Sequence, residues 1–256
     1  MNIIRKILHA FGYDLVPKKI IDEHNFLRRI PYAGEEEKHI MQICRPYTQT
    51  TPETMFALIR AVKYIVRNNI PGVFVECGVW KGGSAMAMAM MLDQLKYHRE
   101  ICLFDTFTGM PPGCDLDIDL DGNDEKWYRE KSDQYVHAGS GAAWNASSLE
   151  EVRSNLAKIG NTLQQFRFIQ GRVEETLPEK ANSEIALLRL DTDFYSSTKH
   201  ELIHLFPRLA KGGILIVDDY GHFLGARKAV DEYFRENNIA MFMNRVDYTA
   251  IIGVKS

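Results

Sequence analysis

Residues 73–84, which read VFVECGVWKGGS, decide the fold of this chain of 256 residues. An apolar run typical of a strand ends in Glu76, passes through Gly78 and continues into a Gly-Gly-Ser that opens a helix rich in alanine and methionine. A strand, a tight turn and a helix in this order bring backbone close to a ligand at the helix N-terminus, as nucleotide-type cofactors require. The stretch therefore predicts an α/β fold that binds such a cofactor.

The turn differs from the dinucleotide-binding pattern Gly-x-Gly-x-x-Gly. Trp80 occupies the position of the second glycine, where a bulky side chain would obstruct a pyrophosphate. The acidic residue, Glu76, stands before the first glycine, which suits a cofactor that carries an amino group and no phosphates. These residues favour S-adenosylmethionine (SAM) over NAD as the cofactor.

Strand-like and helix-like segments alternate after this turn. Such alternation predicts a mostly parallel sheet with helices on both faces. The last two strands are a residue apart, so they are expected to be antiparallel neighbours. The expected strands span 73–77, 101–105, 166–170, 185–191, 213–218, 240–246 and 248–254. The expected helices span 52–69, 84–97, 149–159, 196–209 and 225–237.

Composition argues against several classes of protein. A net charge of -3 gives no overall attraction to nucleic acid. No apolar run approaches the roughly 18 residues of a transmembrane helix. The four cysteines contain no C-x-x-C pair, so we expect reduced, buried thiols in a cytoplasmic protein.

Residues 1–50 lack the strand–helix alternation and are expected to form a helical N-terminal extension, serving as a lid or an oligomer arm. Apolar residues recur there at helical spacing, namely Ile3, Ile4, Ile7, Leu8 and Phe11. We expect this helix to pack on the domain or on a second subunit. Docking on a membrane surface is the alternative.

Carboxylates stand at the carboxyl ends of the predicted strands, where ligands of open α/β sheets bind. Asp105 ends the second strand, where it can accept two hydrogen bonds from a ribose diol, and the alternative is that it caps a turn. Asp191, Asp218 and Asp219 end two further strands. If those strands are neighbours, the charges converge and a cation is expected unless one acid is protonated. Oxygen ligands favour a hard ion such as Mg²⁺, with simple capping as the alternative.

Such a cation would make a bound substrate hydroxyl easier to deprotonate and would hold it for in-line attack. One of the aspartates could act as general base, with His137 as the alternative. The segment that contains His137 starts with an Asp-x-Asp-x-Asp-Gly pattern at 117–122, which begins like a calcium-binding loop. Tyr128 stands where that loop needs a glutamate, so we expect a flexible acidic loop over the substrate cleft.

Four motifs in order resemble the macrocin O-methyltransferase family, which methylates sugar hydroxyls on macrolides and related glycosides. They are ECGVWKGGS at 76–84, FDTFTGMP at 104–111, LDTDFY at 190–195 and DDY at 218–220. The similarity covers roughly residues 45–235 and includes the segments 47–53 and 69–72.

The resemblance implies a Rossmann-like class I SAM-dependent methyltransferase sheet of seven strands, with the last pair antiparallel, in a domain at 51–256. It also implies a Mg²⁺ requirement and a homo-oligomer. The metal ligands it implies are Asp191, Asp218 and Asp219, with Asp191 also the candidate base. The cofactor-binding residues it implies are Thr48, Thr51, Glu76, Cys77, Gly78, Val79, Trp80, Ser84, Asp105, Thr106, Phe107 and, at the adenine side, Ser148 or Arg172.

The chain departs most from the family in the N-terminal extension and in the 113–145 loop, where acceptor recognition is expected. Its FGYDLVP stretch at 11–17 looks like the leaders of bacterial glycan-modifying methyltransferases. The expected function is therefore SAM- and Mg²⁺-dependent O-methylation of a sugar hydroxyl on a glycosylated natural product or a glycan. Two alternatives remain: an NAD-type oxidoreductase on a similar sheet, and a non-catalytic SAM-binding partner subunit.

Overall fold

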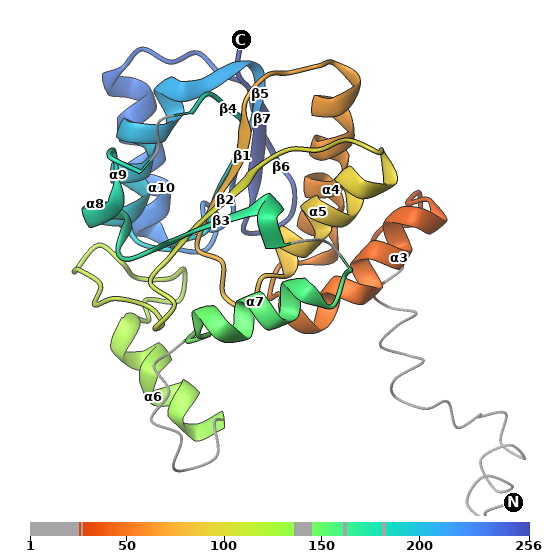
Figure 1. Cartoon of the computed structure of the whole chain (residues 1–256). Helices are drawn as coiled ribbons and strands as arrows, with labels where there is room; N and C mark the ends of the chain where they lie inside the picture. Colours follow the sequence, from red (N-terminus) through yellow and green to blue (C-terminus); the bar gives the residue numbers. More distant parts are fainter. Residues whose placement is uncertain (1–25, 27, 136–144, 161–162, 181–182) are drawn as a thin grey trace, which may run out of the picture.

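The structure is a computed structural model that describes residues 26, 28–135, 145–160, 163–180 and 183–256. A sheet of seven strands lies between two layers of helices (Figure 1). The strands are β1 (Val73–Cys77), β2 (Ile101–Asp105), β3 (Phe166–Gln170), β4 (Ile185–Leu190), β5 (Leu209–Val217), β6 (Met243–Arg245) and β7 (Ile251–Val254). The helices are α3 (Glu35–Cys44), α4 (Pro52–Arg67), α5 (Gly83–Gln94), α6 (Glu125–Tyr135), α7 (Leu149–Ala157), α8 (Val173–Thr176), α9 (Tyr195–Leu205) and α10 (Leu224–Glu236), with 3-10 turns at Arg45–Tyr47, Leu163–Gln165 and Phe206–Arg208.

The strand order β3-β2-β1-β4-β5-β7-β6 confirms the predicted topology. Strands β1 to β5 pair in parallel, whereas β7 is antiparallel to both β5 and β6. The chain starts at the centre with β1, moves outward to β3 and returns to β4 on the other side of β1. The carboxyl ends of β1 and β4 thus form the switch point at which open α/β sheets bind ligands.

Alternate side chains of the strands fill two cores, one on each face of the sheet. Phe74 of β1 belongs to the core beneath α3, α4 and α5, whereas Val75 belongs to the core beneath α9 and α10. Figure 1 shows these helix groups on opposite sides of the strands. Three of the four cysteines are buried as predicted, but Cys114 is exposed.

The helix predicted at 196–209 ends earlier in the structure, and the strand predicted at 213–218 begins earlier. Helix α9 ends at Leu205, a 3-10 turn follows, and β5 already begins at Leu209. Pro207 explains the shift, because it has no backbone N–H to continue an α-helix.

The predicted strands 240–246 and 248–254 are shorter in the structure, at Met243–Arg245 and Ile251–Val254. Asp247 turns the chain between them. Its Oδ1 atom accepts hydrogen bonds from the backbone N–H groups of Thr249 and Ala250, both at 2.7 Å. This side-chain turn takes the place of strand pairing at these residues.

The described part of the segment 113–145 contains regular structure and buried carboxylates that the expected acidic loop does not include. Helix α6 lies within it, and the side chains of Asp117 and Asp119 are buried. Asp117 Oδ1 accepts a hydrogen bond of 2.6 Å from the backbone N–H of Tyr195, the first residue of α9. The carboxylates of this segment therefore stabilise turns and the start of a helix by accepting hydrogen bonds from backbone N–H groups, as short acidic side chains commonly do.

The N-terminal region is only partly described. The predicted helix near residues 3–11 and the alternative base His137 lie outside the described residues. Helix α3 is present, and its residues Ile40, Met41 and Cys44 share a core with α4 and α5. The domain boundary at residue 50 stays a prediction. Among the helices in the described ranges, none combines the length and the apolar character needed to cross a membrane.

Gly78 allows β1 and β4 to approach each other at the switch point. Its φ angle is +84°, and a Cβ atom there would lie 1.8 Å from the carbonyl oxygen of Asp191. The two strand ends are joined at this point by a 2.8 Å hydrogen bond from Asp191 N to Cys77 O. We predict that Gly78→Ala lowers the free energy of unfolding by about 3 kcal/mol or more, as measured by urea denaturation.

Gly122 offers a matched control for this substitution. Its φ angle is +85°, but a Cβ atom there would meet nothing within 4 Å. Gly122→Ala should therefore show only the left-handed backbone penalty of about 1–2 kcal/mol. Equal losses in the two variants would contradict the close approach of β1 and β4 as the reason for Gly78.

Candidate active site

A cavity of about 360 Å³ lies at the carboxyl ends of the central strands. Its walls come from the segment before α4, from the glycine turn after β1, and from the residues that follow β2, β4 and β5. Predicted residues that line it are Thr48, Thr51, Glu76, Gly78, Val79, Trp80, Ser84, Asp105, Thr106, Arg172, Asp191, Asp218 and Asp219. The fold thus brings most of the predicted site into one cavity.

Three predicted cofactor residues do not line the cavity. Cys77 is fully buried in the core beneath α9, and Phe107 is buried in the core on the other face. The Ser148 side chain accepts a 3.1 Å hydrogen bond from Glu151 N as the N-cap of α7. The structure accounts for all three by packing or capping, and their contact with a cofactor stays a prediction.

Asp105 organises the glycine turn. Its Oδ2 atom accepts hydrogen bonds from the backbone N–H groups of Val79 (2.6 Å) and Trp80 (3.2 Å), and its Oδ1 atom accepts one from Phe107 (2.7 Å). Burial raises the pKa of Asp105, although these backbone bonds act in the opposite direction. Asp105 thus caps the turn, which was the alternative role. Its binding to a ribose, through the remaining lone pairs of its carboxylate oxygens, stays a prediction.

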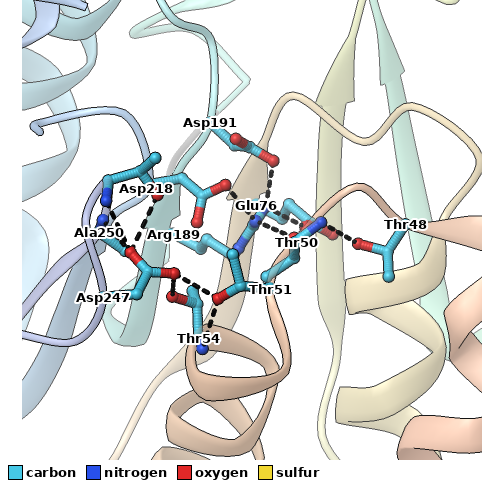
Figure 2. A network of polar contacts seen from close by, with 11 residues as sticks. Thr48, Thr50, Thr51, Thr54, Glu76, Arg189, Asp191, Asp218, Asp247 and Ala250 are labelled. Atoms are coloured by element: carbon cyan, nitrogen blue, oxygen red, sulfur yellow. Dashed lines mark hydrogen bonds and ion pairs between the residues drawn. The ribbon is translucent and has the colours of Figure 1, made fainter. Parts of the chain in front are cut away.

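Arg189 lies at the centre of the acidic residues, and Figure 2 shows its contacts. Its Nη1 atom lies 2.9 Å from Glu76 Oε1 and 2.5 Å from Asp191 Oδ2. Its Nη2 atom lies 3.1 Å from Asp218 Oδ2 and donates a 2.8 Å hydrogen bond to Thr50 Oγ1. Glu76 and Arg189 are direct cross-strand partners of β1 and β4, which places both side chains on the same face of the sheet.

One guanidinium cannot balance the carboxylates around it. Burial raises the pKa of Glu76 to about 8, against the opposing effect of Arg189. Burial and neighbouring carboxylates raise the pKa values of Asp218 and Asp219 well above their usual range. Burial disfavours the charge of Arg189, but Asp191, Asp218 and Glu76 together raise its pKa. The cluster therefore needs further positive charge, from protons or from a bound cation.

The acidic cluster fits a divalent cation. Asp191, Asp193 and Asp219 each offer a carboxylate oxygen, and these atoms all lie within 4.8 Å of one another. Opposite ligands of an octahedral Mg²⁺ are about 4.2 Å apart, so small side-chain shifts suffice to surround one. Asp219 Oδ2 and Asp218 Oδ1 are buried and have no hydrogen-bond partner among the described residues. Asp193 therefore joins the predicted ligands as a further candidate, whereas Asp218 also contacts Arg189.

The segment 48–51, which forms one wall of the cavity, is held from two directions (Figure 2). Arg189 binds Thr50 from the sheet. From the loop between β6 and β7, Asp247 Oδ2 accepts hydrogen bonds from the hydroxyl groups of Thr51 and Thr54, the latter at 2.8 Å. Thr51 also caps α4 as predicted, since its side chain accepts a bond from Thr54 N at 3.2 Å.

Sequence reasoning missed several of these residues. Arg189 has a recognisable signal, because a charged residue inside a run of six buried strand residues needs a partner. Asp193 stands two residues after Asp191, at the same strand end, and carries the same signal, but the predicted metal ligands do not include it. Asp247 and Thr50 carry no such signal, since their roles depend on contacts between distant parts of the chain.

Comparison with known proteins agrees with this geometry. A family model described as Macrocin-O-methyltransferase (TylF) matches residues 43–254. The chain belongs to the macrocin O-methyltransferase family. The predicted resemblance is thereby confirmed, and SAM-dependent O-methyl transfer is favoured over the nicotinamide-dependent alternative.

Relatives of this macrocin O-methyltransferase family member span most of its length. A Streptomyces olivaceus 8-demethyl-8-(2,3-dimethoxy-alpha-L-rhamnosyl)-tetracenomycin-C 4'-O-methyltransferase is 33% identical, covering 98% of this chain and 90% of the relative. A Micromonospora griseorubida mycinamicin III 3''-O-methyltransferase is 28% identical, covering 93% and 87%. The structure of the O-methyltransferase NovP superposes with a TM-score of 0.68 at 31% identity, covering 82% of each chain. The class I methyltransferase fold is thus confirmed.

We predict that Arg189→Gln lowers the free energy of unfolding by about 3–5 kcal/mol, because removing one partner of a buried charge cluster leaves the others uncompensated. Urea denaturation followed by circular dichroism measures this loss. Arg29→Gln is the matched control, since Arg29 forms an exposed ion pair with Glu53 at 2.8 Å. That pair should contribute no more than about 1 kcal/mol. If both variants are equally stable, Arg189 does not hold the cluster together.

Proposed function

We propose that this protein is a Mg²⁺-dependent SAM O-methyltransferase that methylates a sugar hydroxyl of a glycosylated natural product. One observation carries the proposal: the carboxylates of Asp191, Asp193 and Asp219 converge in the same cavity as the glycine turn after β1. A methyl donor and a cation that binds the acceptor can therefore occupy adjacent positions. The names of two relatives, a rhamnosyl-tetracenomycin-C 4'-O-methyltransferase and a mycinamicin III 3''-O-methyltransferase, support a sugar acceptor.

The residues around the glycine turn suit the donor. Glu76 Oε2 is buried without a hydrogen-bond partner among the described residues, so it is available to accept from the ammonium group of SAM. Trp80 and Val79 supply the turn itself, which Asp105 holds in shape. Thr48 and Thr51, from the opposite wall, complete the predicted contacts to the methionine end.

Asp191, Asp218 and Asp219 would hold the cation, together with Asp193. When bound, SAM supplies a methyl group on a positively charged sulfur, and Mg²⁺ makes the acceptor hydroxyl easier to deprotonate. The protein contributes by excluding other orientations and by aligning the acceptor oxygen with the methyl carbon. The polar contacts of Arg189 keep the carboxylates of Asp191 and Asp218 in fixed positions for this task.

Asp191 is the candidate general base. It lines the cavity, and its side chain is 26% exposed compared with 15% for Asp218, so it can reach the acceptor. With SAM bound, the acceptor oxygen would form a bond to the methyl carbon while the carbon–sulfur bond breaks, and the electron pair of the broken bond would stay on sulfur to give S-adenosylhomocysteine. The hydroxyl proton would pass to the carboxylate of Asp191.

We also propose a homo-oligomeric assembly and a cytoplasmic location, and the four free cysteines support the latter. A bacterial surface polysaccharide or glycolipid is the alternative acceptor to an antibiotic. The two acceptor classes differ in the group attached to the sugar, and a screen of both kinds of glycoside separates them.

Methyl transfer from labelled SAM to a panel of glycosides tests the reaction, beginning with methyl α-L-rhamnopyranoside. We expect Asp191→Asn to reduce turnover by about 10²–10⁴-fold, the usual contribution of a general base, or further if the cation is lost as well. Binding of S-adenosylhomocysteine, measured by calorimetry, should change little in this variant.

The control for this substitution is Asp93→Asn, which alters an exposed aspartate at the end of α5 and should leave both quantities unchanged. Normal turnover of Asp191→Asn would refute the assignment of Asp191. Binding of NAD in place of S-adenosylhomocysteine would revive the oxidoreductase alternative. Binding of S-adenosylhomocysteine with no transfer to any glycoside or glycan would favour the non-catalytic partner subunit.

A further inference from the structure

A second series of hydrogen-bonded polar side chains reaches the cavity from the segment between β2 and α6. The first member of this series is Asp119. This side chain is 3% exposed and accepts four hydrogen bonds. Its Oδ1 atom accepts from the backbone N–H groups of Asp121 and Asn123, both at 2.8 Å. Its Oδ2 atom accepts from the side-chain amide of Asn123 at 2.9 Å and from the Tyr128 hydroxyl at 2.6 Å.

These bonds keep Asp119 ionised. Burial alone would raise its pKa, but the bonds from Tyr128 and Asn123 outweigh that effect and lower the pKa to about 2. An ionised carboxylate has no proton to donate, so the single proton of the Tyr128 hydroxyl lies on the side of Asp119. Toward any other neighbour, the hydroxyl oxygen of Tyr128 can then only accept.

One such neighbour among the described residues is His222, whose Nε2 atom lies 2.9 Å from the Tyr128 hydroxyl oxygen. Because the hydroxyl proton is directed to Asp119, the proton between Tyr128 and His222 must sit on Nε2. In the neutral ring, Nδ1 is then the atom with the lone pair. Among the described residues, Nδ1 has no hydrogen-bond partner, and it is not one of the polar side-chain atoms that are buried without a partner.

The ring of His222 is fixed in orientation by aromatic neighbours. The rings of Phe223, Tyr248 and Tyr128 meet it nearly edge-on, with centroids 4.7, 5.9 and 6.3 Å away. Both His222 and Tyr128 line the same cavity as the acidic cluster. The backbone also ties His222 to that cluster, since His222 N donates a 3.0 Å hydrogen bond to Asp219 O.

We propose that Asp119, Tyr128 and His222 form a relay that keeps the proton of His222 on Nε2 and presents Nδ1 to a hydroxyl of the sugar acceptor. This inference rests on the proposed function. A pyranose carries hydroxyls on adjacent carbons, so one hydroxyl can be held by His222 while its neighbour lies at Asp191. The relay would thereby select which hydroxyl is methylated, which makes His222 a specificity-determining residue and Asp119 and Tyr128 positioning residues.

Two substitutions of His222 separate the roles of its nitrogen atoms. The side-chain amide of asparagine reaches about as far as Nδ1, whereas that of glutamine reaches about as far as Nε2. We expect both to weaken transfer to methyl α-L-rhamnopyranoside, and His222→Gln to raise the acceptor KM at least about tenfold more than His222→Asn. Binding of S-adenosylhomocysteine should be unchanged in both variants.

Tyr128→Phe removes the relay proton and keeps the aromatic ring. We expect a higher acceptor KM and a changed ratio of methylated positions, read by NMR of the product. Tyr220→Phe is the matched control, because the Tyr220 hydroxyl donates to Asp231 at 2.8 Å outside the cavity. It should leave KM and the product ratio as they are in the unaltered protein.

A measurement without acceptor tests the tautomer directly. Long-range ¹⁵N–¹H correlation spectra of the histidine-labelled protein with S-adenosylhomocysteine bound, recorded at alkaline pH, should show the His222 proton on Nε2. That proton should exchange slowly with water, and faster in Tyr128→Phe. A proton found on Nδ1, or exchange that Tyr128→Phe does not alter, would overturn the relay.

The kinetic outcomes distinguish the relay from the proposed function. If the unaltered protein transfers methyl groups but His222→Gln and His222→Asn have equal KM values, the relay is wrong and the function stands. If the unaltered protein transfers to no sugar, the function fails, and the acceptor role of His222 fails with it. Transfer with the expected order of KM values and the expected spectra supports both.

Discussion

The arrangement of the site depends on one buried, positively charged side chain. Arg189 is 1% exposed and lies against Glu76, Asp191 and Asp218, which come from the ends of three neighbouring strands. A bare charge in such a position would be very costly, and the partners offset that cost. The strand ends can therefore bring several carboxylates together only because β4 places a guanidinium between them. The remaining excess of negative charge is what makes the cavity suitable for a cation and for a positively charged methyl donor.

The same residue also connects the sheet to the parts of the chain that close the cavity. Its hydrogen bond to Thr50 holds the segment before α4 against the strand ends, and Asp247 holds the next residue, Thr51, from the last hairpin. Segments nearly 200 residues apart in sequence thus share one polar network (Figure 2). The strand ends and the cavity wall at 48–51 are positioned by a continuous set of contacts. A shift at Arg189 should therefore reach both of them.

Much of the fold was predictable, because its signals are local. The turn at 73–84, the alternation of strands and helices, and the caps at Thr51 and Ser148 each depend on neighbouring residues. Errors arose where distant contacts or a single residue decide the outcome. Pro207 moved the start of β5, Asp247 shortened the final strands, and buried Asp117 and Asp119 organised a segment that resembles a flexible loop.

The candidate site was predictable to a similar extent. Residues at strand ends could be placed together because parallel strands deliver their ends to one edge of the sheet. Arg189 is part of the core pattern, and its partners become visible only once β1 and β4 are known to be neighbours. Tyr128 and His222 are 94 residues apart, and no sequence spacing relates them. Acceptor-side contacts of this kind depend on loop conformation, which propensities alone do not specify.

The acidic cluster beside the glycine turn should bind one divalent cation. Mn²⁺ substitutes for Mg²⁺ at oxygen-rich sites and has an electron paramagnetic resonance signal, so it can be titrated into the protein with S-adenosylhomocysteine bound. We predict one bound Mn²⁺ per chain, displaced by Mg²⁺, and loss of this site in Asp219→Asn. Titration with no bound Mn²⁺, or with binding that Asp219→Asn leaves intact, would contradict it.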